Sequence, residues 1–296
     1  MSHENFKDIS YEAHEAHYLN SLDHIDRLKN KESIDYWRHN QMYQTLLPLL
    51  SDKSSNWLTV GDGVGTDANW LLEYNENVVC SDISDVLLKK SKERGYIKEF
   101  SKENAEKLSY SDSSFDYVLC KEAYHHFPRP YIAVYEMIRV SSKAVILIEP
   151  VDIIIHMAPM LWLKNILDKF STTLINKVWK NRSSFETVGN YVYKVSEREM
   201  EKIAAGINLP CVAFKGFNDY FTTDLDLNQP ITNRKVFNKF KFRLNLKNLF
   251  SNLYLTPYML QTSIIFKESP TQEVLNKLKE MKYKIIELPK NPYLNN

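Results

Sequence analysis

Residues 60–71, VGDGVGTDANWL, hold the pattern that decides the fold expected for this chain. The segment before them, Trp57–Gly61, is short and apolar, as a buried strand is, and the residues from Thr66 to Tyr74 have a helical pattern. Three glycines join the two: Gly61, Gly63 and Gly65. Because glycine has no Cβ, the backbone can turn sharply there and approach a ligand closely.

The alternation of strands and helices continues along the chain from this turn. Apolar segments predict further strands at Asn77–Asp82, Phe115–Cys120 and Lys143–Pro150. Helices are predicted between them at Asp85–Arg94 and Pro130–Arg139. Strands that alternate with helices indicate an α/β fold, in which a mainly parallel sheet is covered by helices on both faces.

The flanking regions differ from this core in their pattern. We expect an N-terminal helical lid over residues 1–50, the core over 51–150, a helical and aromatic insertion over 151–195, and a C-terminal part of the core over 196–296. Within the last part, Ser196 and Glu199 fit a helix capping box. Late strands are expected near 211–221 and 262–268, with a lysine-rich, aromatic insertion between them and a helix and short strand after them.

The second predicted strand ends at an acid, Asp82, about 20 residues after the glycine turn. A carboxylate at this place can accept hydrogen bonds from both hydroxyls of a ribose. The order of strand, turn, helix, strand and acid therefore predicts a site for a nucleoside-containing cofactor. Gly63, Gly65 and Ala68 also satisfy the GxGxxA fingerprint of dinucleotide-binding proteins, so the turn alone leaves NAD open.

The segment Glu103–Phe127, ENAEKLSYSDSSFDYVLCKEAYHHF, narrows this choice. Together with the turn it resembles the class I S-adenosylmethionine-dependent methyltransferases, in particular the small-molecule group with an HHF segment. The resemblance covers Trp57 to Pro150 and implies a Rossmann-like fold with a seven-stranded, mainly parallel sheet. It implies S-adenosyl-L-methionine as the cofactor and methyl transfer as the reaction.

The resemblance also assigns roles to individual residues. It places the turn around the methionine part of the cofactor, Asp82 on the ribose and Ile83 on the adenine. Lys121 and Glu122 would lie beneath the methionine or the acceptor. The residues expected to bind the cofactor are Gly61, Asp62, Gly63, Gly65, Asp82, Ile83, Asn104, Ala105, Glu106, Lys121 and Arg38.

The chain departs from the family pattern at two positions. Thr59 stands where the family usually has an acid that helps to hold the ammonium group of the cofactor. Asp62 or Glu122 is a candidate to replace that acid. Asn104 stands where the family often has aspartate, which is a mild change because an amide can also hydrogen-bond to adenine.

The candidate catalytic residues follow the strand that ends at Cys120. His125 is a candidate general base, because a histidine near its ordinary pKa can deprotonate a hydroxyl, and Tyr124 is a weaker candidate. The alternative for both is a structural role. Methyl transfer depends chiefly on alignment of the two reactants, so no fixed triad is required. Arg38 is a candidate partner for the carboxylate of the cofactor, with ordinary packing as the equal alternative.

Composition narrows the class of protein further. The formal net charge is +1, which gives no general reason for attraction to nucleic acid or to membranes. Three scattered cysteines, with no CxxC pair, do not suggest a disulfide framework or a zinc site. His14 and His17 lack a third ligand with suitable spacing, so no metal is expected. The polar N-terminus does not resemble a secretory signal, and we expect a cytoplasmic protein.

The acceptor is the least determined part of this hypothesis. We expect a small polar molecule, such as a sugar or a nucleotide-linked sugar of a surface-polysaccharide pathway, bound by the insertion with Trp162, Trp179, Tyr191 and Tyr193. The basic, aromatic strip Lys235–Lys247 is interpreted as a solvated edge or an anion contact. An NAD-dependent oxidoreductase, an RNA methyltransferase and a non-catalytic protein with this fold are the alternatives.

Overall fold

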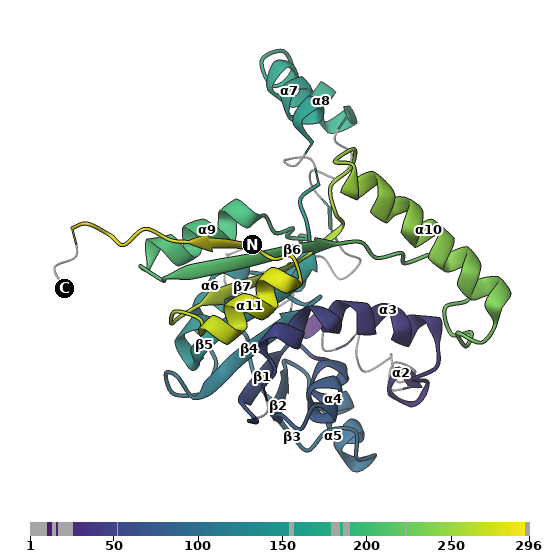
Figure 1. Cartoon of the computed structure of the whole chain (residues 1–296), viewed down its shortest axis with the longest axis vertical. Coiled ribbons are helices and arrows are strands. Elements are labelled where there is room, and N and C mark those ends of the chain that lie inside the picture. The colour runs from purple at the N-terminus through teal and green to yellow at the C-terminus, as the bar shows by residue number, and fades with distance from the viewer. Residues whose placement is uncertain are drawn as a thin grey trace.

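The chain folds around one mixed sheet, and Figure 1 shows the arrangement in a computed structural model. The sheet has eight strands in the order β3-β2-β1-β4-β5-β7-β6-β8. The structure describes residues 11–13, 16, 26–51, 53–153, 157–178, 184–185, 190–222 and 224–293.

Six strands run in one direction and two run against them. The parallel neighbours are β1 with β2 and β4, β2 with β3, and β4 with β5, while β7 is antiparallel to β5 and β6, and β8 to β6. This confirms the prediction of an α/β fold with a mainly parallel sheet. The edge strand β8 extends the expected seven strands to eight. The strands are β1 Asn56–Val60, β2 Asn77–Asp82, β3 Glu99–Lys102, β4 Phe115–Lys121, β5 Ser141–Pro150, β6 Cys211–Phe217, β7 Leu260–Phe266 and β8 Lys284–Glu287.

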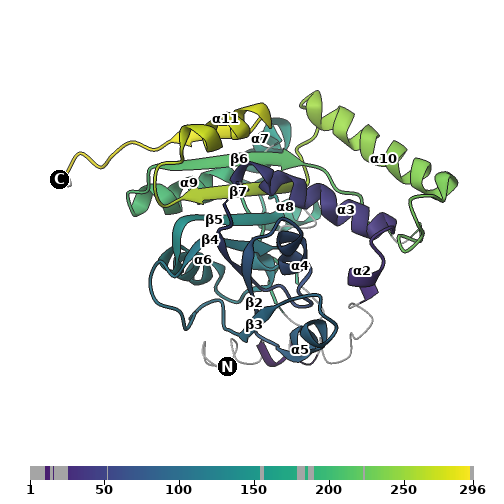
Figure 2. The ribbon, with the colours of Figure 1, turned by 60° about the horizontal axis from the view of Figure 1, so that its bottom comes forward.

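Helices cover both faces of the sheet, as Figure 2 shows. Successive side chains of a strand point to opposite faces, and in β1 Trp57 joins one buried cluster while Leu58 joins the other. The first cluster is completed by η2, α4 and α11, and the second by α6 and α9. The helices of these layers are α3 Ile34–Tyr43, the 3-10 helix η2 Gln44–Leu49, α4 Thr66–Glu73, α5 Val86–Glu93, α6 Pro130–Val140, α9 Glu197–Gly206 and α11 Gln272–Glu280.

Local sequence explains where several helices begin and end. The Ser196 hydroxyl accepts a hydrogen bond from the Glu199 backbone N–H, which confirms Ser196 as the N-cap of α9, while the Glu199 carboxylate accepts the Ser196 hydroxyl. Ser33 and Thr271 cap α3 and α11 in the same way. Pro48 lies within η2, so the regular α-helix before it ends at Tyr43.

The expected insertions contain helices that lie away from the sheet. Figure 1 shows α7 Ala158–Leu167 and α8 Thr172–Val178 projecting from the body as a pair. The lysine-rich strip belongs to the 19-residue helix α10 Arg234–Asn252, which packs on the side of α3. Short helices α2 Asp26–Lys29 and η3 Tyr124–His126 complete the described elements. Among the described residues, no helix is both long enough and apolar enough to cross a bilayer.

Candidate functional site

The glycine turn lies at the carboxyl end of β1, between β2 and β4. Gly61, Gly63 and Gly65 have φ of +73°, +31° and +84°, in the region that favours glycine. A Cβ on Gly61 would lie 2.5 Å from Cβ of Ala123, so the loop after β4 packs directly on this turn. The order of strands reverses between β1 and β4, and open α/β sheets bind ligands at such points.

Asp62 turns inward and binds the start of α4. Its carboxylate accepts hydrogen bonds from the backbone N–H groups of Asp67 and Ala68 at 3.0 and 2.9 Å, and from the Thr59 hydroxyl at 2.9 Å. Burial and the nearby Asp67 raise the pKa of Asp62 to about 7. The Asp62 carboxylate thus faces the protein interior, and its candidate role in place of the acid absent at Thr59 stays a prediction.

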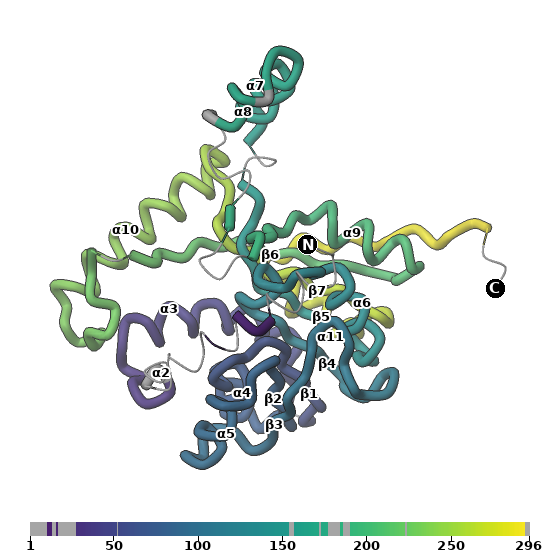
Figure 3. Tube along the Cα trace, turned by 180° about the vertical axis from the view of Figure 1, so that it is seen from behind, coloured from purple at the N-terminus to yellow at the C-terminus, as the bar shows by residue number. Residues whose placement is uncertain are grey.

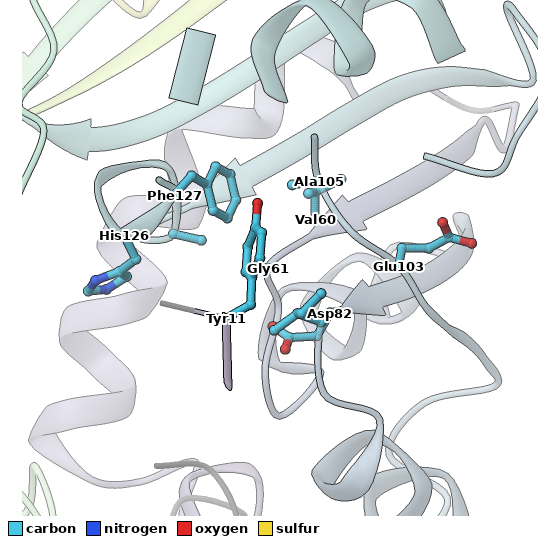
Figure 4. Close-up of a pocket in the computed structure, with 10 residues that line it drawn as sticks. Tyr11, Val60, Gly61, Asp82, Glu103, Ala105, His126 and Phe127 are labelled. Atoms are coloured by element: carbon cyan, nitrogen blue, oxygen red, sulfur yellow. The ribbon is translucent and has the colours of Figure 1, made fainter. Parts of the chain in front are cut away.

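Asp82 lines a hollow beside the glycine turn, which Figure 4 shows in close-up. Its two carboxylate oxygens accept the backbone N–H groups of Gly63 and Ser84, each at 2.9 Å. Burial raises the pKa of Asp82 to about 6. An ionised carboxylate has about four acceptor positions, so this side chain can also accept from ligand hydroxyls.

The hollow brings together several residues that the sequence predicted and some that it did not. Gly61, Asp82, Ile83 and Ala105 all line it, as the cofactor hypothesis expects. The remaining lining residues are Tyr11, Val60, Glu103, Ala123, His126 and Phe127. The ring of Tyr11 reaches into the hollow between Phe127 and Asp82 (Figure 4). No pattern near Tyr11 marked it as a site residue.

Asn104 and Glu106 shape the loop at the rim of this hollow through contacts within the protein. Asn104 accepts the backbone N–H of Glu106 through its side-chain oxygen at 2.9 Å. The Glu106 carboxylate receives the backbone N–H of Arg129 at 2.9 Å and its guanidinium at 2.6 Å. These contacts fix the loop that carries Ala105, while the predicted cofactor contacts of Asn104 and Glu106 stay predictions.

A cluster of buried charges lies on the other side of the turn, between α3 and α4. The Arg38 guanidinium binds Asp219 at 2.5 Å and Asp35 at 3.0 Å. Its Nη2 also lies 3.0 Å from Nε2 of His39. This geometry ties α3 to the segment after β6 and favours the packing role of Arg38 over the hypothesis that it binds a cofactor carboxylate.

Lys121, the last residue of β4, and Glu122, which follows it, belong to the same cluster. The Lys121 ammonium lies 3.5 Å from Asp67 and 3.4 Å from Glu122, and it sits over the Tyr43 ring. Although burial opposes its charge, Asp67 and Glu122 raise the pKa of Lys121. Lys121 is therefore held as a cation inside the protein, and its predicted contact with a cofactor stays a prediction.

Glu122 has two properties of a functional residue. Its φ is +51°, an uncommon conformation for a residue other than glycine, which concentrates at binding sites. Burial opposes its charge, but Lys121, His39 and Arg38 outweigh burial and lower the pKa of Glu122 to about 2. Burial and Lys121 lower the pKa of His39 to about 3, so this imidazole is neutral.

A second hollow adjoins this cluster at the start of α4. It is lined by Leu28, Asp35, Tyr36, His39, Tyr43, Thr66, Asn69 and Trp70. The two hollows thus flank the glycine turn, one toward β2 and one toward α3. The predicted lid region contributes to both, through Tyr11 on one side and α3 on the other.

His125 is bound to a carboxylate that the sequence analysis did not identify. Its Nδ1 lies 2.6 Å from Oε2 of Glu149, which is fully buried at the end of β5. The other oxygen of Glu149 accepts the backbone N–H groups of Ala123 and Tyr124, each at 2.9 Å. In the sequence, Glu149 was marked only as an acidic residue within an otherwise apolar predicted strand.

The remaining candidates for the acceptor side differ in position. The Tyr124 side chain is 2% exposed and packs in the core, where burial raises the pKa of its hydroxyl, so its position supports the structural role. Tyr193 donates its backbone N–H to the His125 carbonyl at 3.3 Å, and its ring packs against Tyr191. Trp162 is exposed on α7, away from this region, and Trp179 lies outside the described residues, as do His14 and His17. The described residues contain no cluster suited to a metal ion.

Comparison with known proteins adds to this geometry. Residues 58–148 match the family model of a methyltransferase domain. A search of curated proteins found no match. Among solved structures, YcgJ from Bacillus subtilis is 17% identical with a TM-score of 0.50, and the alignment covers 78% of this chain and 100% of that one.

Two further solved structures show the range of the similarity. The Burkholderia thailandensis 1,6-didemethyltoxoflavin-N1-methyltransferase, solved with 1,6-didemethyltoxoflavin and S-adenosylhomocysteine, is 10% identical with a TM-score of 0.50 over 91% of this chain and 92% of that one. The [4+2]-cyclase SpnF is 24% identical, with a TM-score of 0.33, and the alignment spans 38% of this chain and 45% of that one. At these identities the likeness concerns the fold.

Proposed function

We propose that the chain, whose residues 58–148 match the family model of a methyltransferase domain, binds S-adenosylmethionine at the glycine turn and methylates a small polar acceptor. The observation that supports this assignment best is the position of the Asp62 carboxylate. This carboxylate accepts hydrogen bonds from the backbone N–H groups of Asp67 and Ala68 at the start of α4.

This position of Asp62 separates the two cofactor hypotheses. A dinucleotide places its anionic diphosphate at the first helix N-terminus after the glycine turn. In this chain a carboxylate of the protein already accepts those N–H groups, and Asp67 adds a second acid beside it. A diphosphate would therefore meet negative charge without free donors, which argues against NAD.

The charge of the adjoining cluster suits a cation. Four carboxyl groups, on Asp35, Asp67, Glu122 and Asp219, surround two cations, Arg38 and Lys121, and His39 is neutral. Burial raises the pKa of Asp67 and of Asp219, whereas the pKa of Glu122 is lowered to about 2, so Glu122 is the carboxylate held ionised. S-adenosylmethionine carries a sulfonium and an ammonium group, which an ionised carboxylate attracts. Since Asp62 faces inward, Glu122 is the carboxylate that we assign to the ammonium group in place of the absent acid at Thr59.

We assign the hollow lined by Asp82 to the nucleoside part of the cofactor. Asp82 would accept the ribose hydroxyls, since an ionised carboxylate has about four acceptor positions and the backbone N–H groups of Gly63, Ile83 and Ser84 do not fill all of them. Ile83, Ala105 and Phe127 provide apolar contact for the adenine. When bound, S-adenosylmethionine supplies an electrophilic methyl carbon and its own leaving group.

His125 is the residue that we assign to the proton of the acceptor. When Nδ1 of the neutral ring donates to Glu149, Nε2 carries the lone pair that can take a proton. The nucleophile of the acceptor gains the methyl group and loses its proton to His125. The buried Glu149 carboxylate stabilises the imidazolium that forms.

The acceptor region is the side of the hollow where residues 190–193 pack on η3. The ring centroids of Tyr191 and Tyr193 lie 5.0 Å apart there, and the Tyr193 backbone N–H donates to the His125 carbonyl. Aromatic faces beside a proton acceptor suit a sugar hydroxyl. We therefore keep a sugar or a nucleotide-linked sugar as the proposed acceptor class, to be tested against other small hydroxyl and amine compounds.

Cofactor titration followed by an acceptor screen tests this function. Calorimetric titration of the purified chain should show saturable binding of S-adenosylmethionine and S-adenosylhomocysteine and none of NAD. Methyl-labelled cofactor should then transfer label to one class of acceptor. Binding of NAD instead would contradict the assignment, and a protein that binds neither compound would support the non-catalytic alternative.

A further inference from the structure

The helix α10 exposes an apolar stripe on the face opposite to its buried one. Phe237, Phe240 and Leu244 pack inward against α3. The exposed side chains Phe242, Leu246, Leu249 and Leu253 follow at intervals of four, three and four residues, which places them on one outer face. Phe242 is 68% exposed and Leu253 58% exposed, so most of this surface contacts solvent.

The same helix is strongly basic. Residues 234–252 contain no acidic residue and six basic ones, Arg234, Lys235, Lys239, Lys241, Arg243 and Lys247. Three of them make contacts within the protein: Arg243 binds Asp224, Lys247 donates to the Asp219 carbonyl, and the Lys241 ammonium lies over the Phe237 ring. Lys235 and Lys239 are exposed and continue the line of the apolar stripe toward the start of α10. The net charge of +1 for the whole chain conceals this local surplus.

A second exposed apolar element lies on the same side of the molecule. No residue of α7 is buried, and the side chain of Trp162 is 68% exposed. Phe170 and Leu174, near the start of α8, are also exposed. Figures 1, 2 and 3 agree that the C-terminal end of α10 lies beside the stem of the α7–α8 pair. The exposed Tyr254 and Leu255 follow directly on that end.

From this arrangement we propose that the outer face of α10 and the α7–α8 pair together dock the protein on an anionic lipid bilayer. Lysines at one end of the stripe would lie among the headgroups, while the phenylalanine and leucines after them enter the boundary with the acyl chains. α10 is apolar on two faces, and its inner face is covered by α3, so the exposed face presents Phe and Leu beside lysines, which are the residue types of an interfacial helix. This mode of attachment requires no helix that spans the bilayer.

Charge decides between this partner and a second copy of the chain. If two copies of α10 packed on each other, the lysines of one helix would face lysines or leucines of the other. No carboxylate would be available to pair with them, because α10 contains no acidic residue. In α7, the acid next to the end of the helix, Asp168, already binds Lys164. Anionic headgroups supply the negative charge that neither helix contains.

RNA fits the same surface less well. A phosphate backbone would pair with the lysines, but Leu246, Leu249 and Leu253 would have no counterpart, since bases stack on aromatic or planar groups. A bilayer satisfies the cationic and the apolar part of the stripe together. The docked α7–α8 segment leaves the body after Glu149 and returns before Tyr191, so the His125 end of the sheet would face the membrane.

Vesicle sedimentation of the full-length protein tests the proposal. Vesicles of phosphatidylcholine mixed with phosphatidylglycerol should bind the protein at least about tenfold more tightly than phosphatidylcholine alone, and added salt should weaken binding. The double variants Phe242→Ser/Leu246→Ser and Lys235→Glu/Lys239→Glu should each weaken it by about tenfold or more. The matched control Tyr135→Ser/Lys279→Glu changes exposed residues on α6 and α11 and should bind normally.

Tryptophan emission reports on the α7–α8 pair separately. Addition of the mixed vesicles should shift the emission to shorter wavelength, and Trp162→Phe should remove most of the shift. Equal sedimentation with neutral and anionic vesicles, or none with either, would overturn the proposal. A dimer that the Phe242→Ser/Leu246→Ser variant abolishes, or salt-sensitive binding of an RNA oligonucleotide in the absence of vesicle binding, would assign the surface to those partners instead. Because all readouts are binding measurements without the cofactor, they stand apart from the test of methyl transfer.

Discussion

Nδ1 of His125 lies 2.6 Å from Oε2 of Glu149, and this carboxylate also binds the two backbone N–H groups that open η3. One buried acid thus fixes both the fold of the loop after β4 and the orientation of the imidazole on it. The geometry resembles the general arrangement in which a third group orients a catalytic base. It makes Glu149 a positioning residue in the proposed reaction.

Glu149→Gln tests this role with little change in shape. The glutamine oxygen can still accept the N–H groups of Ala123 and Tyr124, while its NH2 group would face Nδ1 of His125 and donate to it. The ring would then carry its proton on Nε2 and lose its function as a base. We expect kcat to fall by about 10²-fold or more, with the KM for S-adenosylmethionine nearly unchanged.

The pH profile of kcat separates positioning from a structural role. Loss of the carboxylate destabilises the imidazolium, so the acidic limb of the residual activity should move to lower pH. His125→Gln should remove that limb, and the double variant should be no slower than the slower single variant. A Glu149→Gln protein with the profile of the unchanged enzyme would refute the role of Glu149.

Asp82 should make cofactor binding depend on pH. Burial raises its pKa to about 6, and ribose hydroxyls donate to the ionised form, so affinity for S-adenosylmethionine should be highest above pH 6 and fall as the pH decreases through that value. Asp82→Ala should abolish measurable binding while the far-UV circular dichroism stays unchanged. Affinity of the Asp82→Ala variant equal to that of the original protein would count heavily against the assigned site.

The same group has the opposite effect on stability. The pKa of Asp82 is higher in the folded protein than its ordinary value of about 3.9, so ionisation favours the unfolded chain. Its contribution to stability should therefore decrease as the pH rises from about 4 to about 6. Asp82→Asn should flatten that part of the curve of unfolding free energy against pH, as measured by urea denaturation without cofactor.

Glu122 allows charge and backbone strain to be tested separately. Glu122→Gln keeps the side-chain shape but removes the charge assigned to the ammonium group, and we expect the Kd for S-adenosylmethionine to rise by about tenfold. The effect should be constant from pH 5 to pH 9, since the carboxyl pKa is about 2. Because φ is +51°, Glu122→Gly should weaken binding equally but raise thermal stability relative to Glu122→Gln. Unchanged affinity in both variants would remove Glu122 from the site.

Much of the core was predictable because its signals are local. The glycines at 61, 63 and 65 require positive φ, and the apolar run that ends at Pro150 matches a strand buried on both faces. Asp82 was identified because an acid at the end of the second strand has a known partner in a ribose. Of these residues, Gly61 and Asp82 line one hollow, as the cofactor hypothesis expects.

Long-range contacts explain what the sequence did not reveal. Tyr11 enters the hollow across the surface of the core, and Glu149 meets His125 only because β4 and β5 are neighbours in the sheet. Asp62 lies between Gly61 and Gly63 in the turn. Its side chain nevertheless points inward, because the Thr59 hydroxyl and the backbone N–H of Asp67 donate hydrogen bonds to it. α10 has apolar residues on two faces, so its sequence lacks the single apolar stripe by which amphipathic helices are identified.

A pair of glycines measures how much the glycine turn depends on close packing. Gly61 and Gly95 have nearly the same φ, +73° and +74°, so alanine imposes similar backbone strain at both. Their surroundings differ, because a Cβ on Gly61 would lie 2.5 Å from Cβ of Ala123, whereas nothing lies within 4 Å at Gly95. Gly95→Ala should cost about 1 kcal/mol of unfolding free energy from strain alone. Gly61→Ala should cost a further 1–3 kcal/mol or so from overpacking, with urea denaturation as the measurement.

The cofactor affinity of Gly61→Ala should also fall, since the loop after β4 must move away from the turn, while Gly95→Ala should bind as before. Equal destabilisation by the two variants would show that the turn tolerates displacement of Ala123.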